Sequence, residues 1–167
     1  MKLNKKKAAI NTLEAAIQIQ PSNRASLTRY LALNDTPEDK NKALIFLSDM
    51  AEKNKEEKTI KLGIAELLAQ QGKVKEALEI VNSLGGDDNK PSKAIAATYK
   101  IGIKHAIRNN EGDTALTLAQ EARKALPEDM TIGLMLASIQ LEQEKVDDGY
   151  ATLQELKIAH SDSERPY

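Results

Sequence analysis

The feature that most constrains the fold of this chain is a pattern of small and apolar residues that recurs about every 34 residues. Its clearest copy holds Ala115, Ala119 and Ala122, which lie three or four residues apart and share one helix face; Pro127 ends that helix. A period of this length predicts a stack of helical hairpins, each burying its apolar face against the next. The five copies begin at Ala9, Ala43, Ala77, Ala115 and Gly149, at intervals of 34, 34, 38 and 34 residues. Their later members are Leu13 and Ala16, Leu47 and Met50, Val81 and Leu84, Ala119 and Ala122, and Leu153 and Leu156.

Local signals place helix ends between these copies, and together they predict an all-α protein. Thr36 is suited to cap a helix whose first residue is Pro37. Gly72 is expected to adopt the left-handed conformation that ends a helix. Gly149 stands where the other copies have Ala, which indicates a close crossing of two helices. Because the chain has only four Tyr, one Phe and no Trp, we expect a core that is aliphatic and rich in Ala.

The period also predicts the organisation of the chain, as a single domain over residues 1–167 with about four and a half repeats. Because the first helix carries only the second half of the pattern, we expect a fragment of a longer array; the alternative is a short protein capped by Lys5 to Lys7. The four extra residues are assigned to Gly85–Pro91, which reads as a turn or loop. The predicted units are a half repeat (2–23), repeat 1 (24–57), repeat 2 with the insertion (58–95), repeat 3 (96–129) and repeat 4 (130–163).

Composition argues against several classes of function. A net charge of −1 and five aromatic residues do not suit a nucleic-acid-binding protein. With no Cys, and only His105 and His160 as imidazoles, neither a thiolate nucleophile nor a zinc site is expected. Asp87–Asn89 lacks the spacing of a calcium loop, since Thr98 stands where the twelfth-position Glu belongs. No phosphate-binding, dinucleotide-binding or nucleophile-elbow motif occurs, so we expect no cofactor and no enzyme activity.

Membrane insertion is not expected either, because no apolar run approaches the roughly 20 residues that span a bilayer. The lysines at the start of the chain resemble the charged start of a signal peptide. However, Asn11, Glu14 and Gln18 interrupt the segment that follows, which argues against a signal peptide.

The second-helix pattern, its 34-residue period and the helix–turn–helix units resemble the tetratricopeptide repeat. That family's first-helix signature, W-x2-L-G-x2-Y, is kept only in degenerate form. Over the four repeats it reads Leu27-x2-Tyr30-Leu31-x2-Asn34, Lys61-x2-Ile64-Ala65-x2-Leu68, Tyr99-x2-Gly102-Ile103-x2-Ala106 and Gly133-x2-Leu136-Ala137-x2-Gln140. The style is also similar to that of bacterial arrays, including tetratricopeptide lipoproteins of exopolysaccharide and PEP-CTERM export systems. That likeness favours an extracytoplasmic over a cytoplasmic location, although the sequence by itself leaves the compartment open.

The resemblance implies a superhelix that binds a peptide or helix of a partner protein in a concave groove lined by the first helices, within a larger assembly or export system. In that register Lys100, Lys104 and Arg108 form a basic stripe, which suggests an acidic ligand; the alternative is a solvated charged face. Thr28 and Ala32 do not supply the carboxylate clamp of chaperone-binding members. The other residues expected at the groove are Arg29, Leu62, Glu66, Leu134 and Ser138. A rival hypothesis is a structural spacer, or a module that forms homodimers through its exposed terminal helices.

Overall fold

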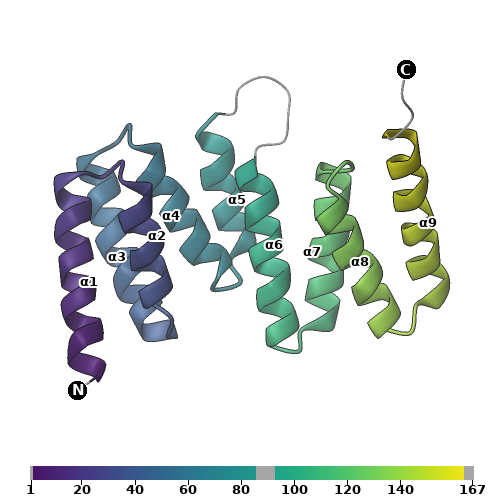
Figure 1. Cartoon of the computed structure of the whole chain (residues 1–167), viewed down its shortest axis with the longest axis horizontal. Coiled ribbons are helices and arrows are strands. Elements are labelled where there is room, and N and C mark those ends of the chain that lie inside the picture. The colour runs from purple at the N-terminus through teal and green to yellow at the C-terminus, as the bar shows by residue number, and fades with distance from the viewer. Residues whose placement is uncertain (1, 86–92, 164–167) are drawn as a thin grey trace. The chain divides into compact units, whose positions relative to one another are not determined.

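The chain is all-helical in the computed structural model, which describes residues 2–85 and 93–163 (Figure 1). These two ranges contain nine helices and no strand, so the all-α prediction is confirmed. Side chains are described for residues 4–85 and 93–159. The helices are α1 (Lys2–Ile19), α2 (Arg24–Leu33), α3 (Pro37–Lys53), α4 (Lys58–Ala69), α5 (Val74–Ser83), α6 (Lys93–Arg108), α7 (Gly112–Ala125), α8 (Met130–Glu142) and α9 (Val146–Ser163).

The helices form two compact units. The first comprises residues 1–85 and holds α1 to α5, and the second comprises residues 86–167 and holds α6 to α9. The boundary lies at Gly85, where the sequence predicts the inserted loop. Gly85 has φ 64°, a left-handed conformation that glycine adopts without steric cost. The rest of the loop predicted over Gly85–Pro91, including the rejected calcium motif from Asp87 onward, lies outside the described residues.

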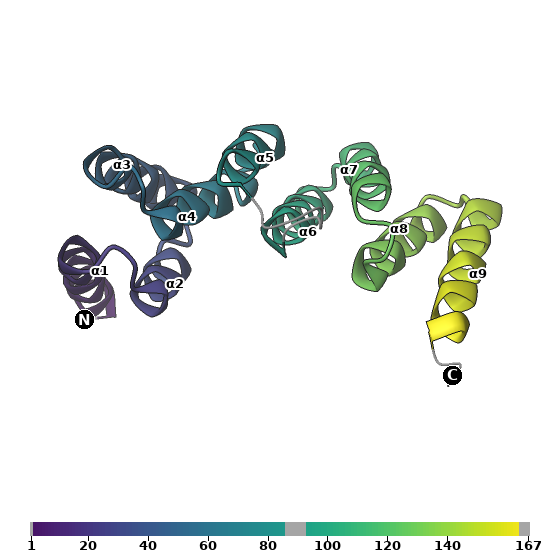
Figure 2. The ribbon, with the colours of Figure 1, turned by 90° about the horizontal axis from the view of Figure 1, so that it is seen from above.

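In the first unit, α4 is the central helix: it contacts α2, α3 and α5, while α1 packs on α2 (Figure 2). Its sequence explains this position, because apolar side chains occupy several of its faces and Ile60, Leu67 and Ala69 are fully buried. Gly63 allows the close approach of the neighbouring helices. A Cβ atom there would lie 2.9 Å from a methyl carbon of Leu27 on α2 and 3.3 Å from one of Leu47 on α3.

The core is not purely aliphatic: Tyr30 is buried in the first unit and Tyr99 in the second, so the prediction from composition is wrong at two positions. Tyr30 of α2 is only 1% exposed. Its ring centroid lies 5.4 Å from that of Phe46 on α3, and its hydroxyl donates a hydrogen bond to Glu14 Oε1 of α1 at 3.1 Å. Burial, together with the neighbouring Glu14 carboxylate, raises the pKa of Tyr30. A buried tyrosine is tolerated here because its polar end has a partner.

Three of the turns from the first to the second helix of a repeat have the same hydrogen-bond pattern. After α4, the N–H groups of Gly72 and Lys73 donate to the carbonyls of Ala69 and Leu68, at 3.1 and 2.9 Å. The same pair of bonds recurs 38 residues later and again after a further 34. The left-handed residues of the three turns are Gly72 (φ 79°), Asn110 (φ 58°) and Glu144 (φ 61°). The prediction for Gly72 is therefore confirmed, and the motif closes the helix end in each case.

The turns from one repeat to the next also recur in hydrogen-bond detail. Asn23, Glu57 and Asp129 each cap the following helix with a side-chain oxygen that accepts a backbone N–H. Within a repeat, Thr36 caps the start of α3 by accepting the N–H of Asp39 at 3.1 Å, and Pro37 is the first helical residue, as the sequence predicts. The repeat period of the sequence is thus matched by hydrogen bonds that recur at the turns.

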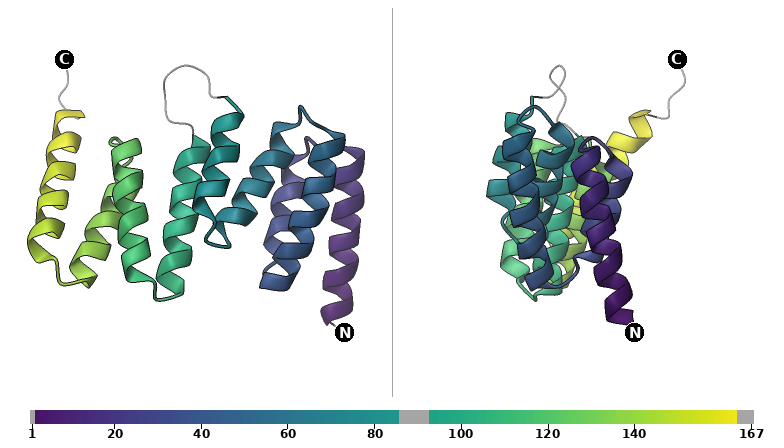
Figure 3. Two further views of the ribbon diagram at one scale, coloured as in Figure 1. Left: turned by 180° about the vertical axis from the view of Figure 1, so that it is seen from behind. Right: turned by 90° about the vertical axis from the view of Figure 1, so that its left-hand side faces the viewer.

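In the second unit, each helix packs on its neighbour in the chain: α6 on α7, α7 on α8 and α8 on α9. Successive helices run in opposite directions (Figures 1 and 3). The contact of α8 with α9 depends on two glycines. A Cβ atom on Gly133 would lie 2.5 Å from Leu156 Cδ2, and one on Gly149 would lie 2.8 Å from Leu141 Cδ2. The close helix crossing predicted at Gly149 is therefore confirmed.

The recurring pattern is fully buried in the copies that begin at Ala43 and Ala115 and only partly buried in the other three. Ala43, Leu47 and Met50 are buried, and so are the three alanines of the copy that begins at Ala115. In α9 the buried residues are Gly149, Thr152 and Leu156, whereas Leu153 is 36% exposed. The expectation that Leu153 belongs to the buried face is thus not met, because among the described helices only α8 makes an extensive contact with α9.

Candidate peptide-binding surface

The basic stripe predicted from the sequence lies along α6 in the second unit. Lys100, Lys104 and Arg108 follow one another at intervals of four residues and so share one side of the helix. Lys104 and Arg108 are exposed, and neither makes an ion pair within the described part of the chain. The sequence of α6 contains no acidic residue at all, and its cations outnumber those of any neighbour in this unit.

One member of the stripe, Lys100, already has a partner. Its Nζ donates to Asp129 Oδ2 at 2.8 Å, and both side chains are about three-quarters buried. Asp129 is also the N-cap of α8, where its other oxygen accepts the N–H of Ile132 at 3.1 Å. The pair therefore joins the middle of α6 to the start of α8.

The environment of Asp129 favours its ionised form. Burial by itself would raise the pKa of this carboxyl. The hydrogen bond from Lys100 and the backbone N–H groups of Ile132 and Thr131 act in the opposite direction, and they hold the pKa of Asp129 below its usual value. At neutral pH the Lys100 charge is therefore matched locally. The charges that remain for a ligand are those of Lys104 and Arg108.

The α8 helix contributes apolar side chains to the surface of the same unit. Leu134 is 50% exposed, and Ser138, one turn further, is exposed as well. Met130, one turn before Leu134 on the same side, is 40% exposed; the sequence reasoning missed it. Glu142 is the only charged residue of this helix. A helix that is apolar on nearly all sides is normally buried, so the exposed part of α8 is a candidate contact surface.

The candidate residues of the first unit have a different character. Leu62 and Glu66 on α4 are partly buried, and Gln70 donates to Glu66 Oε1 at 3.2 Å. Burial raises the pKa of Glu66, and Arg24 at the start of α2 partly opposes that shift. Arg29 on α2 is exposed, but the residue 34 positions later, Gly63, is a packing position. Glu66 stands 38 residues before Lys104, which is the equivalent position of the next repeat. The first unit therefore has an acidic side chain where the second has a basic one.

The two positions that rule out a carboxylate clamp are both exposed on α2: Thr28 and Ala32. Neither carries the cation or amide that such a clamp needs, so the exclusion of a chaperone-type ligand remains a prediction. His105 on α6 is partly exposed, and its Nε2 lies 2.8 Å from Asn109 Nδ2. The side chain of His160 lies outside the described ones.

Several polar contacts were not foreseen because they join residues far apart in the sequence. Lys6 on α1 bonds to Asp35 and Asp39 at 2.6 and 2.9 Å, which ties α1 to the start of α3. In the buried contact of α8 with α9, Thr152 donates to Gln140 Oε1 at 2.9 Å. The only sequence signal for these pairs is at Thr152, a polar residue that stands 34 positions after the apolar Leu118.

No group of three or more His, Asp or Glu side chains among the described residues could hold a metal ion. The helices that the structure describes include none long and apolar enough to cross a membrane. Comparisons with known proteins add no assignment: no protein-family model matches the chain, and no curated protein matches it.

Proposed function

We propose that this chain is a tetratricopeptide-like helical array that binds a peptide or helix of a partner protein and has no catalytic role. The proposal rests on the resemblance in the second-helix pattern and on the recurrence of the same turn hydrogen bonds. The observation that carries it concerns two helices of the second unit. The α6 helix has several basic residues and no acidic one, and the α8 helix exposes apolar side chains.

This surface suits a ligand that is acidic on one side and apolar on the other. Lys104 and Arg108 are free to bind carboxylates of the ligand, while Leu134 and Met130 offer apolar area. Lys100 is held by Asp129 and is expected to contribute less. Charged contacts of this kind accelerate association and weaken as salt is added, whereas apolar contacts do not.

Three designed peptides test the proposal by fluorescence anisotropy at low and high salt. The first is an amphipathic helix with Glu on one face and Leu on the other, the second replaces each Glu by Lys, and the third replaces each Leu by Ala. We expect the first peptide to bind, the second not to bind, and the third to bind weakly. Equal binding of the first two would contradict the proposal.

Variants then locate the binding site. Lys104→Glu combined with Arg108→Glu is expected to abolish binding of the Glu/Leu peptide and to leave the helical circular dichroism unchanged. Lys124→Glu, an exposed cation on α7, is the matched control and should retain binding. If neither the first peptide nor any acidic competitor binds, the spacer hypothesis is favoured.

A further inference from the structure

Two helices of the second unit, α7 and α9, hold equivalent places in the repeat but are covered differently. Leu116 and Ala119 of α7 are 7% and 0% exposed. The residues 34 positions later, Tyr150 and Leu153 of α9, are 63% and 36% exposed. The reason is that α7 lies between α6 and α8, whereas among the described helices only α8 makes an extensive contact with α9.

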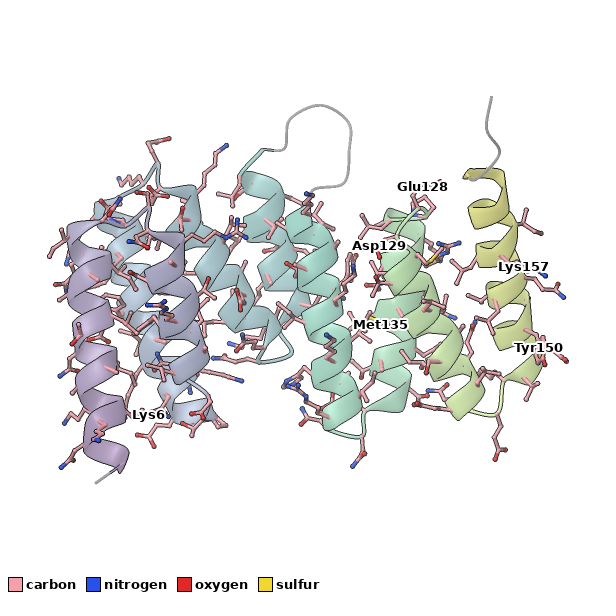
Figure 4. The ribbon with its side chains drawn as sticks, viewed as in Figure 1. Lys6, Glu128, Asp129, Met135, Tyr150 and Lys157 are labelled. Carbon is pink, nitrogen blue, oxygen red and sulfur yellow. The ribbon has the colours of Figure 1, made fainter. Side chains whose placement is uncertain are left out.

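The exposed side of α9 carries a continuous stripe of large side chains. Val146, Tyr150, Leu153 and Lys157 are separated by four, three and four residues and therefore share one face, which we call the α9 outer stripe. It is distinct from the face of Gly149, Thr152 and Leu156 that packs on α8. Figure 4 shows Tyr150 and Lys157 on the side of α9 that points away from α8.

We propose that the α9 outer stripe packs against the same stripe of a second copy of this chain, with the two helices antiparallel. The intervals of four, three and four read the same from either end. An antiparallel copy therefore places Tyr150 opposite the partner's Leu153, and Val146 opposite the aliphatic stem of the partner's Lys157. Such a self-complementary pattern is the requirement for a two-fold symmetric interface.

Charge complementarity selects this arrangement. Asp147 follows Val146 at one end of the stripe, and Lys157 stands at the other end; both are exposed, and neither forms an ion pair among the described residues. In the antiparallel register, Lys157 lies beside the partner's Asp147, and symmetry makes this contact twice. A parallel register would instead bring Lys157 beside the partner's Lys157, and like charges at such a contact oppose association.

The predicted dimer is weak, because one helix pair buries less area than a standard protein interface. We therefore expect a concentration-dependent equilibrium with a micromolar dissociation constant. This interface uses α9 alone. It does not involve Lys104 or Arg108, so it stands independently of the proposed peptide binding.

Sedimentation velocity over a range of concentrations tests the proposal through a charge exchange. Lys157→Glu and Asp147→Lys should each weaken the dimer by about tenfold or more, because each places two like-charge contacts in the interface. An equimolar mixture of the two variants should form a heterodimer, since the substituted acid of one then faces the substituted lysine of the other. The double variant should regain the homodimer.

Two further variants separate the interface from effects on folding. Tyr150→Glu places a charge at the centre of the stripe and should leave a folded monomer. Asp148→Lys changes charge on the opposite side of α9 and should leave the dimer unchanged. A wild-type chain that is monomeric at every concentration would overturn the proposal. So would a dimer that survives Tyr150→Glu, or two single charge variants that do not combine.

Discussion

The turn between α8 and α9 allows a sharp test of the repeat geometry, through the substitution Glu144→Gly. Glu144 has φ 61°, a left-handed conformation that costs a residue with a side chain about 1–2 kcal/mol. Glycine avoids this cost, but it loses about 0.5–1 kcal/mol more backbone entropy on folding. The difference predicts that the substitution stabilises the protein by about 0.5–1 kcal/mol. Glu144 is exposed and forms no ion pair within the described residues, so little else is lost.

The effect of Glu144→Gly can be compared with substitutions at the equivalent position of the other two turns. Glycine already occupies the left-handed position at Gly72, and Gly72→Ala should destabilise the chain by about 1 kcal/mol. Asn110 tolerates the same conformation better than Glu does, so Asn110→Gly should stabilise less than Glu144→Gly. The order of these three effects follows from one backbone geometry that recurs at each turn.

Chemical and thermal denaturation measure the effect, with Glu155→Gly as the matched control. Glu155 is exposed within α9, where glycine costs about 1 kcal/mol relative to a good helix former, so the same exchange should destabilise there. The gain at Glu144 should raise the melting temperature by about 2–4 °C if the whole chain unfolds together, and by more if one unit unfolds separately. Destabilisation by Glu144→Gly, equal to that of the control, would refute the left-handed assignment.

Three other predictions test the packing and the polar contacts. Ala77→Leu should overpack the fully buried contact at α5 and destabilise by about 1–3 kcal/mol in urea denaturation, whereas an unchanged midpoint would contradict its burial. Because the pKa of Asp129 is lowered in the folded state, its contribution should be complete above its usual pKa of 3.8 and be lost as the pH falls through the lower, folded value. The stability difference between the wild type and Asp129→Asn, measured from neutral to acid pH, should therefore shrink toward low pH; a constant difference would show that the contact with Lys100 does not favour the carboxylate. Thr152→Val should remove the donor that satisfies the buried Gln140 and cost about 1–3 kcal/mol, while Thr152→Ser, which keeps the hydroxyl, should cost less.

The sequence by itself determined the helices and the positions where they cross. Helix periodicity and capping are local, so Ala43, Ala77 and Ala115 could be assigned to buried faces and Thr36 to a cap without knowledge of the fold. The same holds for Gly149, since a small residue at a recurring apolar position already indicates a close contact. The residues of the basic stripe could also be placed on one side of a helix from their spacing alone.

Only the tertiary structure decided which side chains meet across helices. The partner of Lys100 is Asp129, 29 residues away, and that of Tyr30 is Glu14, 16 residues away. No local pattern encodes such a pair, because it depends on how two helices are packed. For the same reason the sequence could not tell that Tyr150 is left exposed while Leu116, its equivalent, is buried. Periodicity specifies the face of a helix, and the neighbouring helices determine whether that face is covered.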